Sequence, residues 1–554
     1  MSDKTKKIIK WVVAYAVMTL IGGATYYITL PAINLQSEGF WFFLAFLILL
    51  YTLPLSGIRV DMEVLKQGQV KTTRARRGRA RYMLLALVPV LVVIVGSIIS
   101  STFFNAKSYA SVITVKEAVF ADDMPETENV TNIALMDSAT AAIVGNRTLG
   151  SLSEVVSQYE VGASYTQINY QRSPKKVANL EYAGFFKWLG NRERGIPGFV
   201  MVDPVTNDAE YCSLSEPMRF VESAYFGEDL LRRVRFDYPT KILGEPRFEV
   251  DDEGNPVYVV PCYRPRVMLF GALDVEEVIL FDPTDGSSEI FSVTDTPSWI
   301  DVVYDGNLAT EKYNWLGTLS GGYWNSIIGN KDCKQTTDDF GYIVIEDDVW
   351  YFTGVTSVNS DRSNIGFILS NARTGEYKFY PVIGAEEHSA MAAAQGEVQE
   401  KGYVASFPAL INVRGEATYI MVLKDSGGLV KLYAMVNVEQ YSIVATGKTQ
   451  DEAKRAYLEK LATEGVLSPE DEPTPPAADT LSLTLTLDAL TPVVSGGESY
   501  LYLRGKDASG GVHLLKTVIA NNEKVLLLSV GDTLTVTVEK TETEGVYTLL
   551  SFTK

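Results

Sequence analysis

The sequence predicts a membrane-anchored α+β protein that ends in a small all-β barrel. Three observations lead to this fold class. Three uncharged apolar segments occur within the first 104 of 554 residues. A long region of mixed strands, helices and dense turn signals follows them. After a proline-rich acidic segment, the remaining residues alternate between short apolar strands and turns. A chain of this length is expected to form several domains.

The apolar segments span about residues 12–30, 40–55 and 83–104, and each is predicted to be a transmembrane helix. A bilayer core requires about 20 apolar helical residues, and the first and third segments meet this length. The second segment is shorter, so it is either an untilted span or one arm of a re-entrant hairpin. The charges of the loops favour a span.

Basic residues predict how these segments are oriented. Residues 1–10 contain four lysines and the loop 56–81 contains eight basic residues, whereas the loop 31–39 contains none. Because positive charge is retained on the cytoplasmic side, we expect a cytoplasmic N-terminus and extracytoplasmic residues 105–554. Five arginines of the basic loop are expected to mark topology and contact anionic lipid, the alternative being a nucleic-acid arm: Arg74, Arg76, Arg77, Arg79 and Arg81.

The charge balance of the remaining chain limits its partners. Residues 82–554 hold 37 of the 49 basic residues and 64 of the 68 acidic ones. Such a surface favours cationic partners or divalent cations and argues against nucleic acid. Two histidines and three widely spaced cysteines give no zinc spacing and no disulfide framework. We therefore predict no metal site and no cofactor, in a low-disulfide envelope such as that of Gram-positive bacteria.

The extracytoplasmic part divides by composition. Residues 105–127 are expected to form a stalk and residues 128–466 a folded α+β region. Residues 467–479 are rich in proline and acidic side chains, which is typical of an extended linker. Residues 480–554 contain five or six short strands, which favours a small barrel of OB-like or SH3-like type.

One hairpin pattern recurs in the α+β region. An apolar strand ends at Asp203, Asp282 or Asn371, a turn follows, and a second strand leaves the turn. The Asp or Asn side chain opens such a turn, and Gly or Asn takes its left-handed position. The spacings of 79 and 89 residues favour repeated α+β modules. The alternative is a set of unrelated hairpins within one large domain.

These hairpins resemble the strand-Asp-x-x-Thr-Gly-strand hairpin of PepSY-type modules. The first copy departs from that pattern, with Asn207 and Asp208 where glycine is expected. The layout is also similar to that of uncharacterised membrane proteins of Gram-positive bacteria, over roughly residues 110–465, including the blocks Tyr238–Thr240, Pro297–Asp301 and Gly384–Ser389. The resemblance implies an envelope location and modules that bind or inhibit peptidases, and it implies no catalytic residues.

No sequence motif identifies a catalytic centre. Adjacent carboxylates occur at 122–123, 251–252, 338–339 and 347–348, but so acidic a region produces such pairs by chance. The pair at 347–348 is followed by Trp350 and Tyr351, which makes it the strongest candidate for glycoside hydrolysis. The acidic segment 251–255 is interpreted as a plain turn, with a loose calcium site as the alternative.

A cluster of aromatic residues lies between turn residues. It is either part of a β-rich core or, if exposed, a platform for sugars or peptides: Tyr304, Tyr313, Trp315, Tyr323 and Trp324.

Together these features predict a non-enzymatic scaffold or regulatory binding protein of the bacterial cell envelope. It would act through other envelope proteins or through self-association, by strand addition or contact between sheet faces. The alternatives are an extracytoplasmic cell-wall hydrolase that uses a carboxylate pair, and a subunit of an oligomeric channel or transport assembly.

Overall fold

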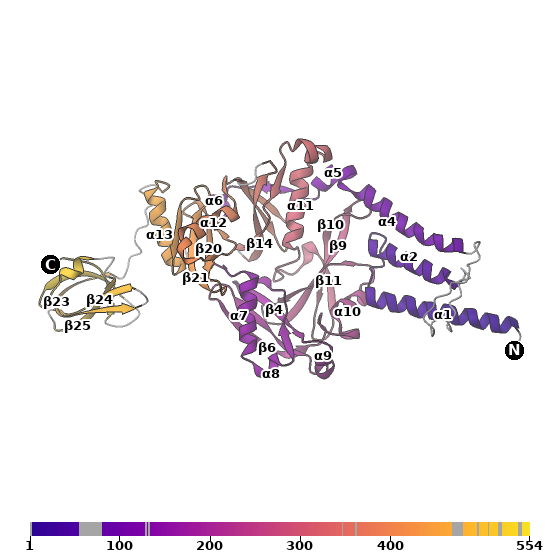
Figure 1. Ribbon diagram of the computed structural model, residues 1–554, viewed down its shortest axis with the longest axis horizontal. Coiled ribbons are helices and arrows are strands. Elements are labelled where there is room, and N and C mark those ends of the chain that lie inside the picture. The colour runs from indigo at the N-terminus through magenta and orange to yellow at the C-terminus, as the bar shows by residue number, and fades with distance from the viewer. Residues whose placement is uncertain are drawn as a thin grey trace. The chain divides into compact units, whose positions relative to one another are not determined.

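The computed structural model describes residues 3–54, 80–127, 130, 133–345, 347–359, 363–467, 480–495, 498–507, 509–518, 523–540 and 546–553 (Figure 1). The chain divides into two compact units, Met1–Thr463 and Glu464–Lys554. Four of the five arginines of the basic loop and nearly all of the predicted linker lie outside the described residues. The fifth, Arg81, places its guanidinium 5.6 Å from the ring centre of Tyr82.

Three apolar helices leave the same side of the first unit (Figure 1): α1 (Asp3–Thr29), α2 (Glu38–Thr52) and α4 (Leu87–Ser100), the last preceded by the 3-10 helix η2 (Ala80–Ala86). Two helical stretches, Lys4–Thr29 and Arg81–Ser100, are long and apolar enough to cross a membrane. α2 has only 15 residues, about 22 Å at 1.5 Å per residue, so it is shorter than a bilayer core. Thr19 Oγ1 lies 2.9 Å from Tyr51 Oη, and Ser97 donates to Glu38, so α2 contacts both neighbours.

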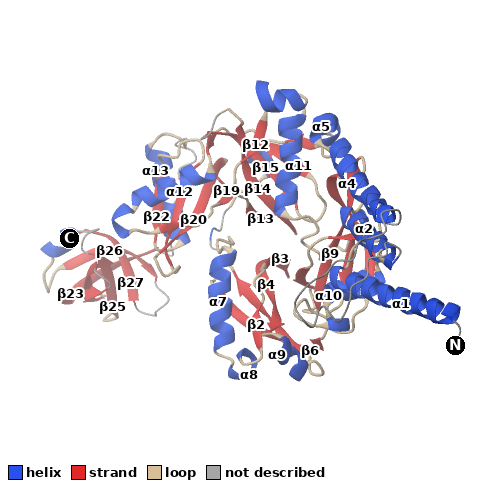
Figure 2. Ribbon diagram, turned by 45° about the vertical axis from the view of Figure 1, so that its right-hand side comes forward, coloured by secondary structure: helices blue, strands red, loops and turns tan. Residues whose placement is uncertain are grey.

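The rest of the first unit consists of four tandem modules, each a helix followed by a five- to seven-stranded sheet that is almost entirely antiparallel. We number them 1 to 4 along the chain. Module 1 begins with α7 (Ser138–Gly150), which lies along its own sheet in Figure 2. Its sheet has the order β2-β4-β5-β6, with β3 also paired to β4. The elements are α8 (Ser153–Val156), β2 (Tyr159–Val161), β3 (Thr166–Tyr170), β4 (Ser173–Tyr182), α9 (Phe185–Asn191), β5 (Ile196–Asp203) and β6 (Asp208–Met218).

Modules 2 and 3 repeat this arrangement. In module 2, the elements are η4 (Phe226–Glu228), α10 (Leu230–Asp237), β7 (Ile242–Leu243), β8 (Arg247–Val250), β9 (Pro256–Val267), β10 (Gly271–Phe281), β11 (Ser288–Ser292) and η5 (Val293–Asp295). In module 3, they are α11 (Gly306–Leu319), the π-helix η6 (Asn325–Gly329), β12 (Lys334–Thr336), β13 (Gly341–Ile345), β14 (Asp348–Ser357), β15 (Ser363–Asn371) and β16 (Tyr377–Tyr380). β17 (Gly384–Ala385) adds to β15 at the edge of this sheet.

Module 4 has the sheet order β18-β20-β21-β22, with β19 also paired to β20. Its elements are α12 (Glu387–Glu397), η7 (Gln399–Lys401), β18 (Val404–Ala405), β19 (Ala409–Val413), β20 (Glu416–Lys424), β21 (Val430–Asn437), β22 (Val444–Gly447) and a closing helix α13 (Gln450–Thr463).

The recurring hairpin of the sequence is the last hairpin of each sheet. Asp203, Asp282 and Asn371 each accept hydrogen bonds from backbone N–H groups two or three residues ahead. Asn207 has a φ of 63°, close to the 78° of Gly286 and the 72° of Gly375, so asparagine replaces glycine in the first copy. A fourth copy, β21–β22, opens at Asn437, whose side chain accepts from Gln440 N.

Residues 105–127 are packed against the modules rather than forming the expected stalk. Their elements are α5 (Thr102–Ala110), β1 (Val115–Glu117) and α6 (Phe120–Asp123). β1 pairs in parallel with β16 and so extends the sheet of module 3. Tyr109, Ile113, Phe120 and Met124 are buried, because their apolar side chains enter cores that the modules leave open.

The second unit is a closed five-stranded barrel in the order β23-β24-β25-β27-β26. The strands are β23 (Thr480–Ser495), β24 (Glu498–Lys506), β25 (Val512–Val518), β26 (Thr533–Lys540) and β27 (Val546–Thr553), with η9 (Glu523–Leu527) after β25. β25 and β27 are parallel, and the other neighbouring strands are antiparallel. Leucines and valines at alternate positions, such as Leu485, Leu503 and Val536, fill the interior.

Buried carboxylates connect the modules. Glu249 of module 2 is completely buried and accepts from the N–H groups of Asp301 and Val302, just before module 3. Asp301 in turn accepts from Asn169 N of module 1 at 2.7 Å. Burial raises the pKa of Glu249, and burial together with repulsion from Glu249 raises the pKa of Asp301. Both carboxyls therefore bind protons more readily in the folded state than in the unfolded state.

We expect this pair to make the protein less stable as the pH rises. A carboxyl with a raised folded-state pKa contributes most below its unfolded pKa, and the contribution is lost as pH passes the folded value. Asp301→Asn keeps an oxygen for Asn169 N and removes the buried charge. It is expected to flatten the fall in melting temperature between about pH 4 and about pH 8, and to add about 1–3 kcal/mol at the alkaline end.

The control is Asp252→Asn on an exposed turn, which should reproduce the wild-type pH profile. An unchanged slope in Asp301→Asn would show that the pair does not govern this pH dependence.

A second prediction concerns the end of α4. Ser100 Oγ is buried and accepts from the N–H groups of Leu269 and Phe270 at 3.1 Å each, at the β9–β10 hairpin. Ser100→Ala leaves these donors without their partner and should cost about 1–3 kcal/mol in unfolding free energy. Ser101→Ala is the matched control, because among the described residues its hydroxyl bonds only to Ile98 O in the preceding helix. Equal melting temperatures for the two variants in detergent would contradict the assigned role of Ser100.

Candidate functional site

The outer end of α1 is fastened to module 2. Arg232 donates to Tyr27 O at 3.3 Å, and its guanidinium lies 4.3 Å from the ring centre of Tyr27. In the following loop, Ile33 N donates to Pro239 O at 2.7 Å, and Asn34 Nδ2 donates to Thr240 O at 2.9 Å. Hydrogen bonds to backbone carbonyls therefore join α1 and the loop after it to module 2.

The end of α4 also contacts module 2, at its β9–β10 hairpin. Besides the contacts of Ser100 Oγ, the carbonyl of Ser100 accepts from Tyr109 Oη at 2.8 Å. Gly96 allows Phe270 to lie against the helix, since a Cβ at this position would come within 2.4 Å of that ring. Module 2 therefore holds a fixed position relative to both long apolar helices.

A polar cavity of about 940 Å³ lies where α1 meets the modules. Its walls come from the end of α1, a loop of module 1, the segment after β6, α10 and the β7–β9 region of module 2, and the start of α11. The lining side chains that carry charge or hydrogen-bonding groups are Thr29, Ser164, Glu222, Arg235, Glu245, Arg247, Tyr263, Asp305 and Asn307.

One wall of this cavity is organised around Asp305. Asp305 caps α11 by accepting from Leu308 N at 2.8 Å, as expected of an aspartate before a helix. It also lies 3.6 Å from Arg247 Nη2 and 3.5 Å from Tyr263 Oη. Burial, followed by repulsion from Asp305, raises the pKa of Tyr263 to about 12. Tyr263 therefore serves as a neutral hydrogen-bonding group near neutral pH.

Another wall is acidic. Glu222 and Glu245 both line the cavity, and both side chains are open to it. Withdrawal from bulk solvent, and then repulsion from Glu181 and Glu245, raises the pKa of Glu222 to about 7. Glu222 is therefore partly protonated at neutral pH.

The five residues of the predicted aromatic cluster do not form one platform. Tyr304 and Tyr313 are buried in two separate cores. Trp315 and Tyr323 pack on the core around Tyr109, with the Trp315 ring 5.1 Å from Tyr109. Only Trp324 is exposed, by 64%, and its ring lies 5.9 Å from Phe103. Most of the cluster therefore follows the core alternative.

Trp324 belongs instead to an apolar edge beside the end of α4. Phe103, Phe104, Ile327 and Ile328 are each exposed by between 46% and 75%. They directly follow α4 or lie in η6, so the edge sits next to a helix long enough to cross a membrane. Aromatic and aliphatic side chains in such a position are typical of a membrane–water interface.

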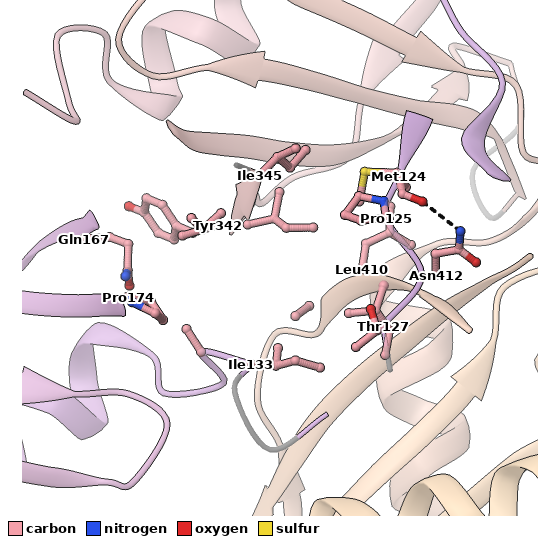
Figure 3. Close-up of a pocket in the computed structure, with 15 residues that line it drawn as sticks. Met124, Pro125, Thr127, Ile133, Gln167, Pro174, Tyr342, Ile345, Leu410 and Asn412 are labelled. Atoms are coloured by element: carbon pink, nitrogen blue, oxygen red, sulfur yellow. Dashed lines mark hydrogen bonds between the residues drawn. The ribbon is translucent and has the colours of Figure 1, made fainter. Parts of the chain in front are cut away.

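A second hollow, of about 160 Å³, lies between modules 1, 3 and 4 (Figure 3). We call it the apolar groove. It is lined mainly by β13 and β19, and by Met124, Ile133 and Pro174. Asn412 Nδ2 donates to Met124 O at 2.8 Å, and Glu126 forms a parallel bridge with Asn412. An extended piece of the chain thus lies along the edge of β19. Among the described residues, β13 pairs only with β14.

The adjacent carboxylates of the sequence have structural partners. Asp347 accepts from Asn169 Nδ2 at 2.8 Å, and Asp348 forms an ion pair with Arg373 at 2.7 Å. Asp251 opens its turn by accepting from two backbone N–H groups, which fits the plain-turn interpretation. Asp123 accepts from Lys378 at 2.9 Å. Within the described ranges, no three carboxylate, imidazole or thiol side chains converge as a metal site requires.

Sequence reasoning missed the polar cavity, because its lining residues come from four segments far apart in the chain. In the sequence, Asp305 could be recognised only as a residue that caps a helix, and Arg247 only as one charged residue among many. In comparisons with known proteins, no family model matches the chain, and no curated protein matches it.

Proposed function

We propose that this chain is a non-enzymatic, membrane-anchored scaffold or binding protein of the bacterial cell envelope, with a cytoplasmic N-terminus and extracytoplasmic modules. The two long apolar helices and the asymmetric basic residues support the anchoring and its direction. The apolar edge around Trp324 supports a bilayer surface at the outer end of α4.

The observation that carries the proposal is the apolar groove with its two edge strands. Residues 124–127 already lie along β19, and Thr127 N donates to Asn412 O at 2.8 Å. The groove therefore accommodates extended chain on one side and offers the edge of β13 on the other. A partner segment that adds to β13 would gain backbone hydrogen bonds and bury an apolar side chain in the hollow. The partner is therefore an extended, apolar protein segment.

The module type is part of the proposal. Four equivalent hairpins at the ends of four sheets support a PepSY-like repeat, with modules that bind proteins. For the second unit, the closed order with a parallel pair between its third and fifth strands supports an OB-like rather than an SH3-like barrel.

A cell-wall hydrolase is the second candidate, and one observation favours it. Besides Asp305, two carboxylates face the polar cavity: Glu222, with its pKa raised to about 7, and Glu245. A proton donor and a carboxylate base in one cavity are what glycoside hydrolysis requires. Release of sugar from wall glycan by the wild-type protein, and its loss in Glu222→Gln, would establish this candidate in place of the scaffold.

The scaffold proposal predicts a defined complex. The full-length protein, extracted gently from its native membrane, is expected to run well above its 61.1 kDa mass and to carry fixed companion chains or further copies of itself. Thr127→Trp fills the groove and should release the partner, because the apolar side chain loses its place. Mass spectrometry of the purified complexes measures both effects.

Glu117→Trp is the control, since this exposed position lies outside the groove. A lone 61.1 kDa species would contradict the scaffold, and loss of the partner in both variants would contradict the groove as its site. A ring of identical copies around the apolar helices would favour the channel or transport assembly instead.

A further inference from the structure

The large polar cavity lies at the height where a membrane surface is expected. Thr29 ends α1, Leu30 follows it, and both line the cavity. α1 is one of the two helices long enough to cross a bilayer, so its end marks the boundary between hydrocarbon and head groups. The volume of about 940 Å³ lies at the upper end of the range of small-molecule sites.

A buried cation in this cavity lacks a counter-ion. The side chain of Arg235 is only 6% exposed and lies among the lining residues. Its Nη1 donates to the carbonyls of Tyr238 and Lys241, which are neutral groups. Its Nε has no hydrogen-bond partner, and no carboxylate of the described residues forms an ion pair with it. A buried charge of this kind is costly unless an anion reaches it.

A second guanidinium shares the cavity and is also incompletely satisfied. Arg247 Nη2 lies 3.6 Å from Asp305, but its Nη1 is buried without a hydrogen-bond partner. Both arginines line the same cavity, and each has one buried N–H group without a hydrogen-bond partner. Two guanidinium groups on one cavity match the oxygens of a phosphate, which accepts several charge-assisted hydrogen bonds.

The acidic wall can bind a cationic group of the same ligand. Glu222 and Glu245 are open to the same cavity, and neither forms an ion pair among the described residues. Their mutual repulsion would be relieved by a cation such as a primary ammonium. The cavity therefore presents donors for an anion and acceptors for a cation at the membrane boundary.

We propose that this cavity binds a zwitterionic phosphate–ammonium group, supplied as the head group of an ethanolamine phospholipid that enters beside the end of α1. Arg235 and Arg247 hold the phosphate, and Glu222 and Glu245 hold the ammonium. The cavity shares no lining residue with the apolar groove, so the proposal is independent of the partner site, while it rests on the proposed membrane anchoring through α1.

The test uses the delipidated full-length protein in detergent and a short-chain phosphatidylethanolamine as the probe, with calorimetry as the readout. Ser164→Trp fills the cavity from an exposed loop of module 1, so it is expected to fold and to bind at least about tenfold more weakly. Arg247→Gln removes one phosphate partner and should weaken binding to a similar extent. Ala163→Trp is the matched control, because this exposed neighbour does not line the cavity and should bind like wild type.

Two further probes separate the sources of the group. Free phosphoethanolamine should bind more weakly than the lipid, because it lacks the chains that run along α1. Short-chain phosphatidylglycerol should also bind more weakly, because it lacks the ammonium. Equal binding by Ser164→Trp and wild type, or no binding of any probe, would overturn the site. Equal affinity for free phosphoethanolamine would overturn delivery from the membrane.

Discussion

The buried carboxylate of Glu249 fixes the relative placement of three modules, and the rest of the first unit is built around that placement. Its two oxygens accept from consecutive N–H groups at residues 301 and 302, so the chain must enter module 3 at one position on module 2. Asp301 then binds the backbone of Asn169 and brings in module 1. A carboxylate buried among apolar side chains is stable only when its acceptors are satisfied, so this joint tolerates little displacement.

Both hollows follow from how the modules meet at such polar joints. Lys424 of module 4 binds Asp137 and Thr140 at the start of α7, so modules 1 and 4 are held at a second point. The apolar groove is lined by segments of modules 1, 3 and 4, and the polar cavity by the end of α1, modules 1 and 2 and the start of α11. Both hollows therefore lie where separate modules meet.

Much of the fold follows from local sequence signals, and the sites do not. The long apolar helices, the turns opened by Asp203, Asp282 and Asn371, and the alternating strands of the barrel depend on residues close in sequence. The fourth hairpin was missed because Asn437 is followed by no glycine. The segment expected to be a stalk was misjudged because Tyr109 and Phe120 are buried by distant modules, which local pattern cannot reveal. Local pattern also could not reveal that the aromatic residues, which are close together in the sequence, pack into separate cores.

Because the chain is so acidic, the incompletely paired Arg235 and Arg247 indicate an anion-binding site. With many more carboxylates than basic residues, many cations among the described residues form an ion pair, as Lys312 does with Asp274 at 2.6 Å and Arg373 with Asp348. Arg235 is buried and, among the described residues, pairs only with carbonyl groups. In a low dielectric, a cation without a counter-ion attracts an anion most strongly. α1 is long and apolar enough to cross a membrane, and lipid phosphates are concentrated where such a helix would leave the bilayer, so the position and the charge of the cavity favour the same ligand.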